Sequence, residues 1–185
     1  MSTLTLRPDS DSVVACSRSG GATNYGCVDE TPASDADYIY VTGVIDAAGT
    51  TSLDLYGMPD RTTETGVISS VTLYMRGWKS SFGGYSGTGG TRLAVKMGGT
   101  TYYSSSQTLA ITASVKSNAW TGNPNNSNLP WTWANIDALI AGVEISSSWY
   151  YDGDLEKHTG YTYCSQFYVE VAYTVGARSY SFIFG

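Results

Sequence analysis

Basic side chains are scarce in this 185-residue chain, which has ten lysines and arginines, sixteen acidic residues and a formal net charge of −6. Nucleic-acid-binding proteins usually present a basic surface to the phosphate backbone, so we expect no nucleic-acid partner. Long apolar runs are also missing, and no stretch approaches the ~20 residues needed to span a bilayer. We therefore expect no membrane insertion.

No signal peptide is visible in the first residues, MSTLTLRPDSDSVV, because no basic segment is followed by an apolar one. The protein is therefore used inside the cell, leaves by lysis or a leaderless route, or lacks its leader in this sequence. Its abundance of Ser, Thr, Gly and Asn suits an extracellular or particle-bound protein better than a cytosolic enzyme.

Histidine occurs once, at His158, in the polar loop YDGDLEKHTG. A Ser/His/Asp or Cys/His mechanism would have to use this residue, and no Ser or Cys stands in a context such as GxSxG. Two-carboxylate hydrolysis needs two acids that face a cleft at a fixed separation, which the sequence does not reveal. We expect that the protein is not an enzyme and that His158 is solvated.

Cysteine occurs three times, so the thiols cannot all pair within one chain. Cys16 and Cys27 bracket the stretch SRSGGATNYG, and a disulfide between them would close a small loop. Cys164 lies in a strand-like run and is expected to be a buried free thiol. The alternative is that all three are reduced and buried, because cysteine packs well as a small hydrophobic residue. No Cys/His cluster suggests a zinc site.

What the sequence does have is 21 glycines, 15 tyrosines and many short runs of alternating polarity. Val71, Leu73 and Met75 alternate with Thr72, Tyr74 and Arg76, which is the period of a half-buried strand. The Gly-Gly of KMGGTTYY is typical of a hairpin turn. About ten such strands, including QTLAITASVKS, predict an all-β fold: an antiparallel, jelly-roll-like β-sandwich.

One segment, WTWANIDALIAGVE, breaks the strand pattern. Its apolar side chains recur at helical spacing, at Trp133, Ile136, Leu139 and Ile140. Thr132 suits an N-cap and Gly142 suits a C-terminal stop. The sequence predicts one short helix near residues 133–141 that lies across the end of the sandwich.

Acidic residues gather in two loops. VDETPASDAD holds Asp29, Glu30, Asp35 and Asp37, and YDGDLE holds Asp152, Asp154 and Glu156. Calcium prefers six to eight oxygen ligands, so the first loop is a candidate calcium site, although neither loop matches an EF-hand. The alternative is a solvated acidic loop in which a carboxylate caps a turn.

Aromatic residues form a third candidate site, at Trp149, Tyr150 and Tyr151 beside the polar DGD loop. Carbohydrate-binding modules stack sugars on aromatic faces, because a pyranose ring offers an apolar C–H face to a π system. Consecutive residues of a strand point to opposite faces, so part of this run must belong to the core. The remainder is a candidate glycan site.

The chain ends in VGARSYSFIFG, directly after the strand-like run QFYVEVAYT. We expect a sandwich domain over residues 1–174 and an extension strand over residues 175–185. The candidate assembly residues are Tyr180, Phe182, Ile183 and Phe184. Such a strand either folds back as a hairpin or crosses to a neighbouring subunit and completes its sheet.

Several phrases, in their order, resemble a largely uncharacterised β-sandwich family encoded among the structural genes of tailed bacteriophages and in environmental genomes. They are TLRPDSD, CVDETPASDADYIYV, DLYGM, ISSVTLYMRG, TWANIDALIAGVEIS and FYVEVAYT. The resemblance covers about residues 3 to 174, and the tail extends beyond it. It implies a jelly-roll-like sandwich on a virus particle or a similar surface, without established catalytic residues.

From these observations we expect a structural, self-assembling protein on a virion or extracellular particle. It would serve as a capsid decoration, tail or fibre subunit, with copies of itself or a major capsid or tail protein as partners. The alternative is a carbohydrate-binding module that uses the loop aromatics.

Overall fold

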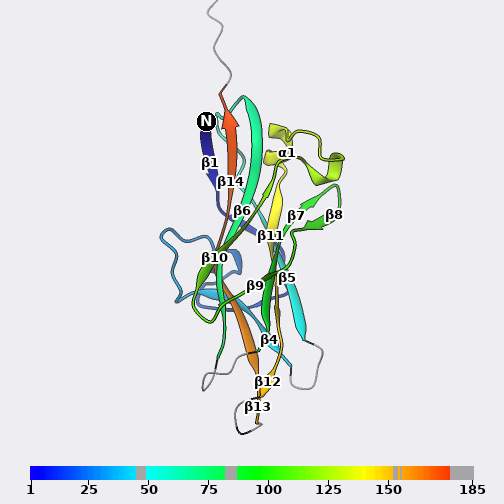
Figure 1. Ribbon diagram of the computed structural model, residues 1–185. Helices are drawn as coiled ribbons and strands as arrows, with labels where there is room; N and C mark the ends of the chain where they lie inside the picture. Colours follow the sequence, from blue (N-terminus) through cyan, green and yellow to red (C-terminus); the bar gives the residue numbers. More distant parts are fainter. Residues whose placement is uncertain (45–48, 82–86, 152–153, 155, 176–185) are drawn as a thin grey trace, which may run out of the picture.

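The chain forms two antiparallel β-sheets packed face to face in a computed structural model (Figure 1), which confirms the predicted all-β sandwich. The structure describes residues 1–44, 49–81, 87–151, 154 and 156–175. Within these ranges no helix is long and apolar enough to cross a membrane. Short elements outside the two sheets are η1 (Tyr25–Cys27), η2 (Pro124–Asn126), α1 (Trp133–Asp137), β12 (Tyr150–Tyr151) and β13 (Lys157–His158).

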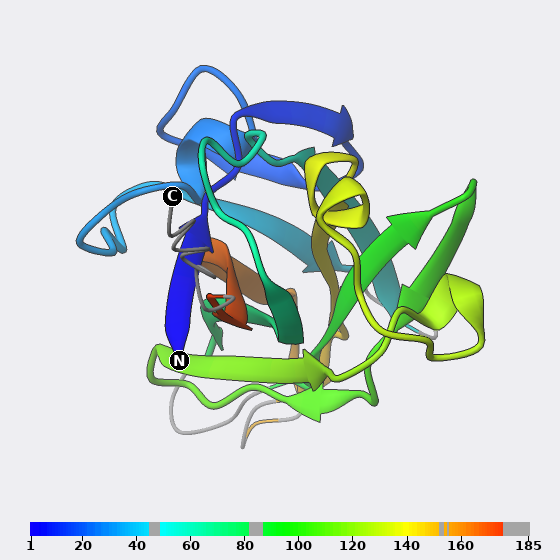
Figure 2. The ribbon, with the colours of Figure 1, turned by 90° about the horizontal axis from the view of Figure 1, so that it is seen from above.

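The first sheet, called sheet A here, has the strand order β10-β6-β14-β4-β3, with β1 also paired to β14. Its strands are β1 (Ser2–Leu6), β3 (Ser17–Ser19), β4 (Tyr38–Gly43), β6 (Val67–Lys79), β10 (Ser114–Trp120) and β14 (Gly160–Thr174). The long strand β14 pairs with β6 on one side, and with β4 and then β1 on the other. The view from above shows β1 running beside β14 (Figure 2).

The second sheet, sheet B, has the strand order β2-β5-β11-β7-β8, with β9 also paired to β7. Its strands are β2 (Ser10–Val13), β5 (Thr50–Gly57), β7 (Gly89–Met97), β8 (Thr100–Tyr103), β9 (Gln107–Thr108) and β11 (Ile140–Ser147). The predicted Gly-Gly hairpin joins β7 to β8. Gly98 and Gly99 have φ values of +56° and +84°, as the favoured two-residue hairpin turn requires.

The core lies between the inner faces of the two sheets. Leu73 and Met75 of β6, Phe167 of β14 and Val143 and Ile145 of β11 are completely buried. Their positions follow the predicted alternation, because every second side chain of a strand points to the same face. Burial of each such side chain contributes about 1.5–3 kcal/mol to folding before the entropy of ordering it is subtracted.

Helix α1 begins where the sequence predicts but ends four residues early. The Thr132 hydroxyl accepts a hydrogen bond from the Asn135 backbone N–H, and the Asn135 side chain accepts one from the Thr132 backbone N–H. This capping box confirms the predicted N-cap. The predicted helical positions after Asp137 are wrong, because Ile140 begins strand β11.

Strand β11 lies in the middle of sheet B, between β5 and β7, so both of its edges are paired. The hydrogen bonds to β5 and β7 favour a strand here more strongly than the spacing of the preceding apolar residues favours a helix. Gly142, predicted to stop the helix, is a buried residue of this strand. A Cβ there would overlap the backbone of Asp54 and Leu55, so the glycine allows close packing of neighbouring strands.

The predicted continuous strand QTLAITASVKS is divided between the two sheets. β9 pairs with β7 in sheet B, whereas β10 pairs with β6 in sheet A. The intervening residues 109–113 therefore cross from one sheet to the other. Leu109, the first residue of this connection, is 1% exposed, so its buried side chain anchors the crossing segment in the core.

A buried carboxylate fixes the chain segment that leads to β3. Asp54 Oδ1 accepts hydrogen bonds from the backbone N–H groups of Ala15 (2.7 Å) and Cys16 (2.8 Å). Its Oδ2 accepts another from the Asn24 side chain at 2.6 Å. A buried carboxylate needs such donors to replace its lost hydration. The network anchors the residues on both sides of β3.

Candidate functional site

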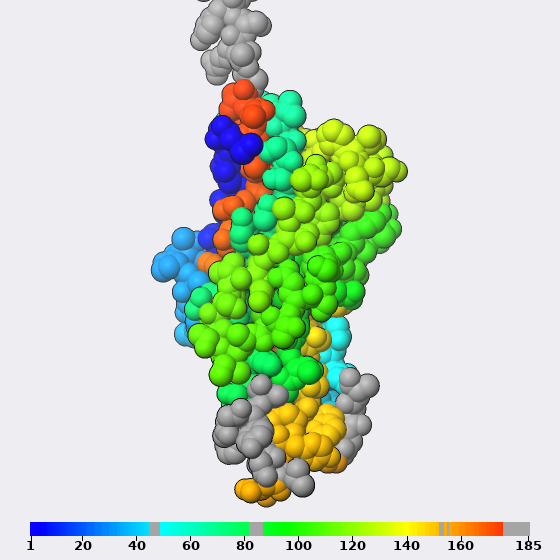
Figure 3. Space-filling model, in the orientation of Figure 1, coloured from blue at the N-terminus to red at the C-terminus, as the bar shows by residue number. Residues whose placement is uncertain are grey.

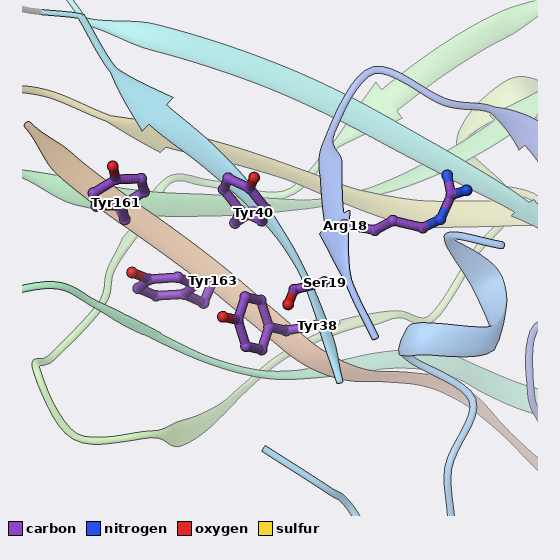
Figure 4. A pocket seen from close by; sticks show the side chains of 6 residues that line it. All are labelled: Arg18, Ser19, Tyr38, Tyr40, Tyr161 and Tyr163. Atoms are coloured by element: carbon purple, nitrogen blue, oxygen red, sulfur yellow. The ribbon is translucent and has the colours of Figure 1, made fainter. Parts of the chain in front are cut away.

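Four tyrosines of β4 and β14 point outward from sheet A and line one hollow of about 250 Å³. They are Tyr38, Tyr40, Tyr161 and Tyr163, and Arg18 and Ser19 complete the lining (Figure 4). We call this feature the tyrosine hollow. Each pair of tyrosines is two residues apart in a strand, so both side chains of a pair emerge on one face.

Strand pairing brings these rings into contact around Tyr163. Its register partners are Tyr40 on β4 and Trp78 on β6. The Trp78 ring stacks on it with centroids 4.9 Å apart, and the Tyr38 ring meets it edge to face at 5.2 Å. Such aromatic pairs contribute about 0.5–1.5 kcal/mol each beyond their buried area. The hollow is therefore a pre-formed aromatic surface.

The hollow is uncharged at its centre. Burial, together with the neighbouring phenols, raises the pKa of Tyr163 to about 12, so its hydroxyl stays protonated. Protonated phenols both donate and accept hydrogen bonds. The Arg18 guanidinium reaches away from the rings (Figure 4) and donates to Gly21 O at 3.2 Å. These features suit a neutral ligand that is rich in hydroxyl groups.

The structure does not bring the four carboxylates of the predicted calcium site together into one metal-binding group. Asp35 forms a bidentate ion pair with Arg76, which lowers the pKa of Asp35. Glu30 lies beside Asp37, and burial together with that carboxyl raises the pKa of Glu30. Neither these residues with Asp29 nor any others in the described ranges form a metal-binding group. Arg76, and not a metal ion, neutralises the charge of Asp35.

The structure has Cys16 and Cys27 as buried free thiols, which is the alternative to the predicted disulfide between them. The Cys27 thiol donates to the backbone oxygen of Thr23 at 3.3 Å, and burial raises its pKa. Burial beside Asp54 raises the pKa of Cys16 as well. The expected buried free thiol at Cys164 is confirmed, and burial raises its pKa to about 12. Protonated buried thiols are poor nucleophiles.

The predicted glycan residues lie in and beside the β12–β13 hairpin and divide between two faces. Tyr150 is buried, and its ring stacks on the partly exposed His158 with centroids 5.6 Å apart. Trp149 and Tyr151 pack edge to face at 4.7 Å, and the Lys157 ammonium lies over the Trp149 ring. These aromatic surfaces contact one another.

Sequence reasoning missed the tyrosine hollow, although part of its signal is visible. YIY at residues 38–40 and YTY at residues 161–163 place tyrosines two apart in strand-like runs. The pairing of β4 with β14, which joins the two motifs, comes from the fold and not from either run.

The candidate assembly residues Tyr180, Phe182, Ile183 and Phe184 lie outside the described residues, as does Asp152 of the second acidic loop. Comparison of the chain with protein-family models and with curated proteins found no match. The resemblance to phage-encoded β-sandwich proteins stays a prediction.

Proposed function

We propose that this protein is a non-catalytic carbohydrate-binding module that holds a neutral saccharide in the tyrosine hollow. The observation that carries this proposal is that two tyrosines of β4 and two of β14 line one open space, with Trp78 of β6 stacked on Tyr163. A pyranose ring stacks its apolar C–H face on such rings, and its hydroxyls pair with phenol groups.

The composition of the hollow also favours binding without catalysis. Among the residues that the structure describes, its lining has no carboxylate and no histidine. Hydrolysis of a glycosidic bond usually requires two carboxylates that flank the bond. The protonated Tyr163 and the outward-turned Arg18 leave no charge at the centre, which favours a neutral saccharide over an anionic one.

Retention on an immobilised panel of neutral glycans tests the proposal. The wild-type protein should bind at least one glycan, and Tyr163→Ala and Tyr161→Ala should each lose most of this retention. Tyr103→Ala is the matched control, because Tyr103 is an outward tyrosine of sheet B that packs under Arg92. Circular dichroism would verify that each variant is folded. Absence of neutral-glycan binding, or equal retention by all folded variants, would overturn the proposal.

A second candidate function is a structural, self-assembling subunit of a virion, in contact with copies of itself or with a major capsid or tail protein. Apolar residues at one end of sheet A favour it, since Met1, Val67 and Val175 are 90%, 69% and 61% exposed. Strand pairing brings them to the same end, where β1 lies beside the last residues of β14 (Figures 1 and 3). Apolar groups gathered in this way are typical of surfaces that a partner covers.

Light scattering and electron microscopy of the purified chain test this second function. The wild-type protein should form oligomers or ordered particles, and Val67→Asp should shift the population towards monomers. Val44→Asp is the matched control, since Val44 is an exposed valine next to β4. A chain that stays monomeric at all concentrations, or an equal effect of both substitutions, would contradict it.

A further inference from the structure

We propose that the ligand is an extended oligosaccharide that continues from the tyrosine hollow along β6 and β14 to a second aromatic subsite at Tyr74. This inference rests on the proposed function because it extends the same site. It starts from the outward row of β6, where Tyr74, Arg76 and Trp78 alternate with the buried Leu73 and Met75. At about 3.3 Å per residue, Tyr74 lies about 13 Å from Trp78 along the strand.

A β-bulge in β14 aligns its aromatic side chains with those of β6. Cys164 pairs with Gly77 and Gln166 pairs with Arg76, so Ser165 is an extra residue in the ladder. An extra residue reverses the alternation that follows it. Tyr168 therefore faces outward like Tyr163, although the two are five residues apart in the sequence. Without this bulge, Tyr168 would point into the core.

The Arg76–Asp35 pair lies between the two aromatic groups. Arg76 Nε donates to Asp35 Oδ1 at 2.9 Å, and Arg76 Nη2 donates to Asp35 Oδ2 at 2.7 Å. The Ser165 hydroxyl donates to the same carboxylate at 2.6 Å. The Arg76 and Asp35 side chains are 30% and 41% exposed, so both reach solvent. A fixed pair of this kind offers donors and acceptors to sugar hydroxyls without a net charge.

The second subsite is the open side of Tyr74, because protein atoms cover both faces of Tyr168. Tyr74 stacks on Tyr168 with centroids 4.7 Å apart and planes 9° apart. Arg7, which follows β1 on the other side of β14, lies over the Tyr168 ring at 5.2 Å. Tyr74 is thus left with the face turned towards β10, where its register partner is the small, exposed Ser117.

The class of saccharide follows from this geometry. The hollow, the ion pair and Tyr74 follow one another along β14 and β6, so an extended chain can contact all three in turn. A single sugar would reach only one of them. We therefore expect a linear, neutral oligosaccharide with an extended backbone, for which cello-oligosaccharides and chito-oligosaccharides are suitable probes.

Calorimetric titration with both probe series, from disaccharide to hexasaccharide, tests the inference. Wild-type affinity for one series should rise with chain length. Tyr74→Ala should weaken hexasaccharide binding about tenfold, as expected for one lost stacking contact, and should leave disaccharide binding unchanged. Ser117→Trp, which keeps Tyr74 and covers its open face, should produce the same loss. Tyr103→Ala should bind every length as the wild-type protein does.

Different outcomes separate the two proposals. Length-independent binding, or hexasaccharide binding unaffected by Tyr74→Ala and Ser117→Trp, would overturn the inference and leave the tyrosine hollow as a single-sugar site. Failure of the wild-type protein to bind either series at any length would overturn the proposed function and the inference together.

Discussion

The β12–β13 hairpin and the tyrosine hollow are both rich in aromatic residues, but they distribute these residues differently. In the hairpin region Trp149, Tyr150 and Tyr151 are consecutive, so alternation buries Tyr150 and packs the other two against each other. In the hollow, tyrosines two residues apart on β4 and β14 point the same way and surround an open space. Aromatic density along the chain therefore matters less for a binding surface than the spacing of aromatic residues on paired strands.

The largest expected difference is in stability, within the hairpin itself. Tyr150→Ala should lower the free energy of unfolding by about 3 kcal/mol, because it removes a large buried side chain and the stack on His158. Tyr151→Ala should lower it by only about 0.5–1.5 kcal/mol, because that side chain is 46% exposed and loses little beyond its edge-to-face contact with Trp149. Urea unfolding of both variants measures the difference. Equal losses would mean that the run is not divided between core and surface.

Saccharide affinity should depend on the tyrosine hollow and not on the hairpin. Trp78→Ala should weaken binding about tenfold, because Trp78 forms the aromatic stack behind Tyr163. Trp149→Ala is the matched control and should leave the affinity unchanged. Calorimetry with one probe saccharide compares them. A loss confined to Trp149→Ala would move the glycan site to the hairpin.

Low pH should lower the stability of the folded protein, because protonation of Asp35 breaks its ion pair with Arg76. The folded-state pKa of Asp35 is lowered by Arg76, so the stabilisation is present above the unfolded-state pKa, near 3.9, and is lost as pH falls through the folded value. Its size should be modest, since the pair is partly exposed. Melting temperatures between about pH 7 and pH 2 measure it. Asp35→Asn should flatten the acid limb, and an acid limb as steep as that of the wild-type protein would contradict this assignment.

A reducing agent should have the smallest effect on stability, because no disulfide supports either aromatic region in the described residues. All three cysteines are buried free thiols, so a reductant should leave the melting temperature unchanged. Thiol alkylation after denaturation, followed by mass spectrometry, should find three labelled cysteines per chain. A Cys16–Cys27 bridge in native material would contradict the structure.

Much of the fold was predictable, because local patterns determine many of its elements. Alternation in β6 and the Gly98–Gly99 turn each point to a structure that the fold contains. The end of α1 was not predictable, since Ile140 joins β11 only because two distant strands pair with it. The same limit applies to Asp35, whose acidic neighbours in the sequence suggested calcium although its partner in space is Arg76.

The candidate site was less predictable than the fold. The YIY and YTY motifs show which tyrosines share a face, but nothing local to either motif shows that β4 and β14 are neighbours. The bulge at Ser165 is equally hidden, because it depends on the register between β6 and β14. The sequence therefore holds the components of the surface, and the pairing of the strands assembles them.

Fluorine NMR of protein labelled with fluorotyrosine tests the central claim most directly. Signals would be assigned by single Tyr→Phe substitutions, and a chito- or cello-oligosaccharide would then be added. The account predicts shifts at Tyr38, Tyr40, Tyr161 and Tyr163, which line the hollow, and none at Tyr151 of the hairpin. Shifts at Tyr151 without any in the hollow, or no shifts at all, would contradict it.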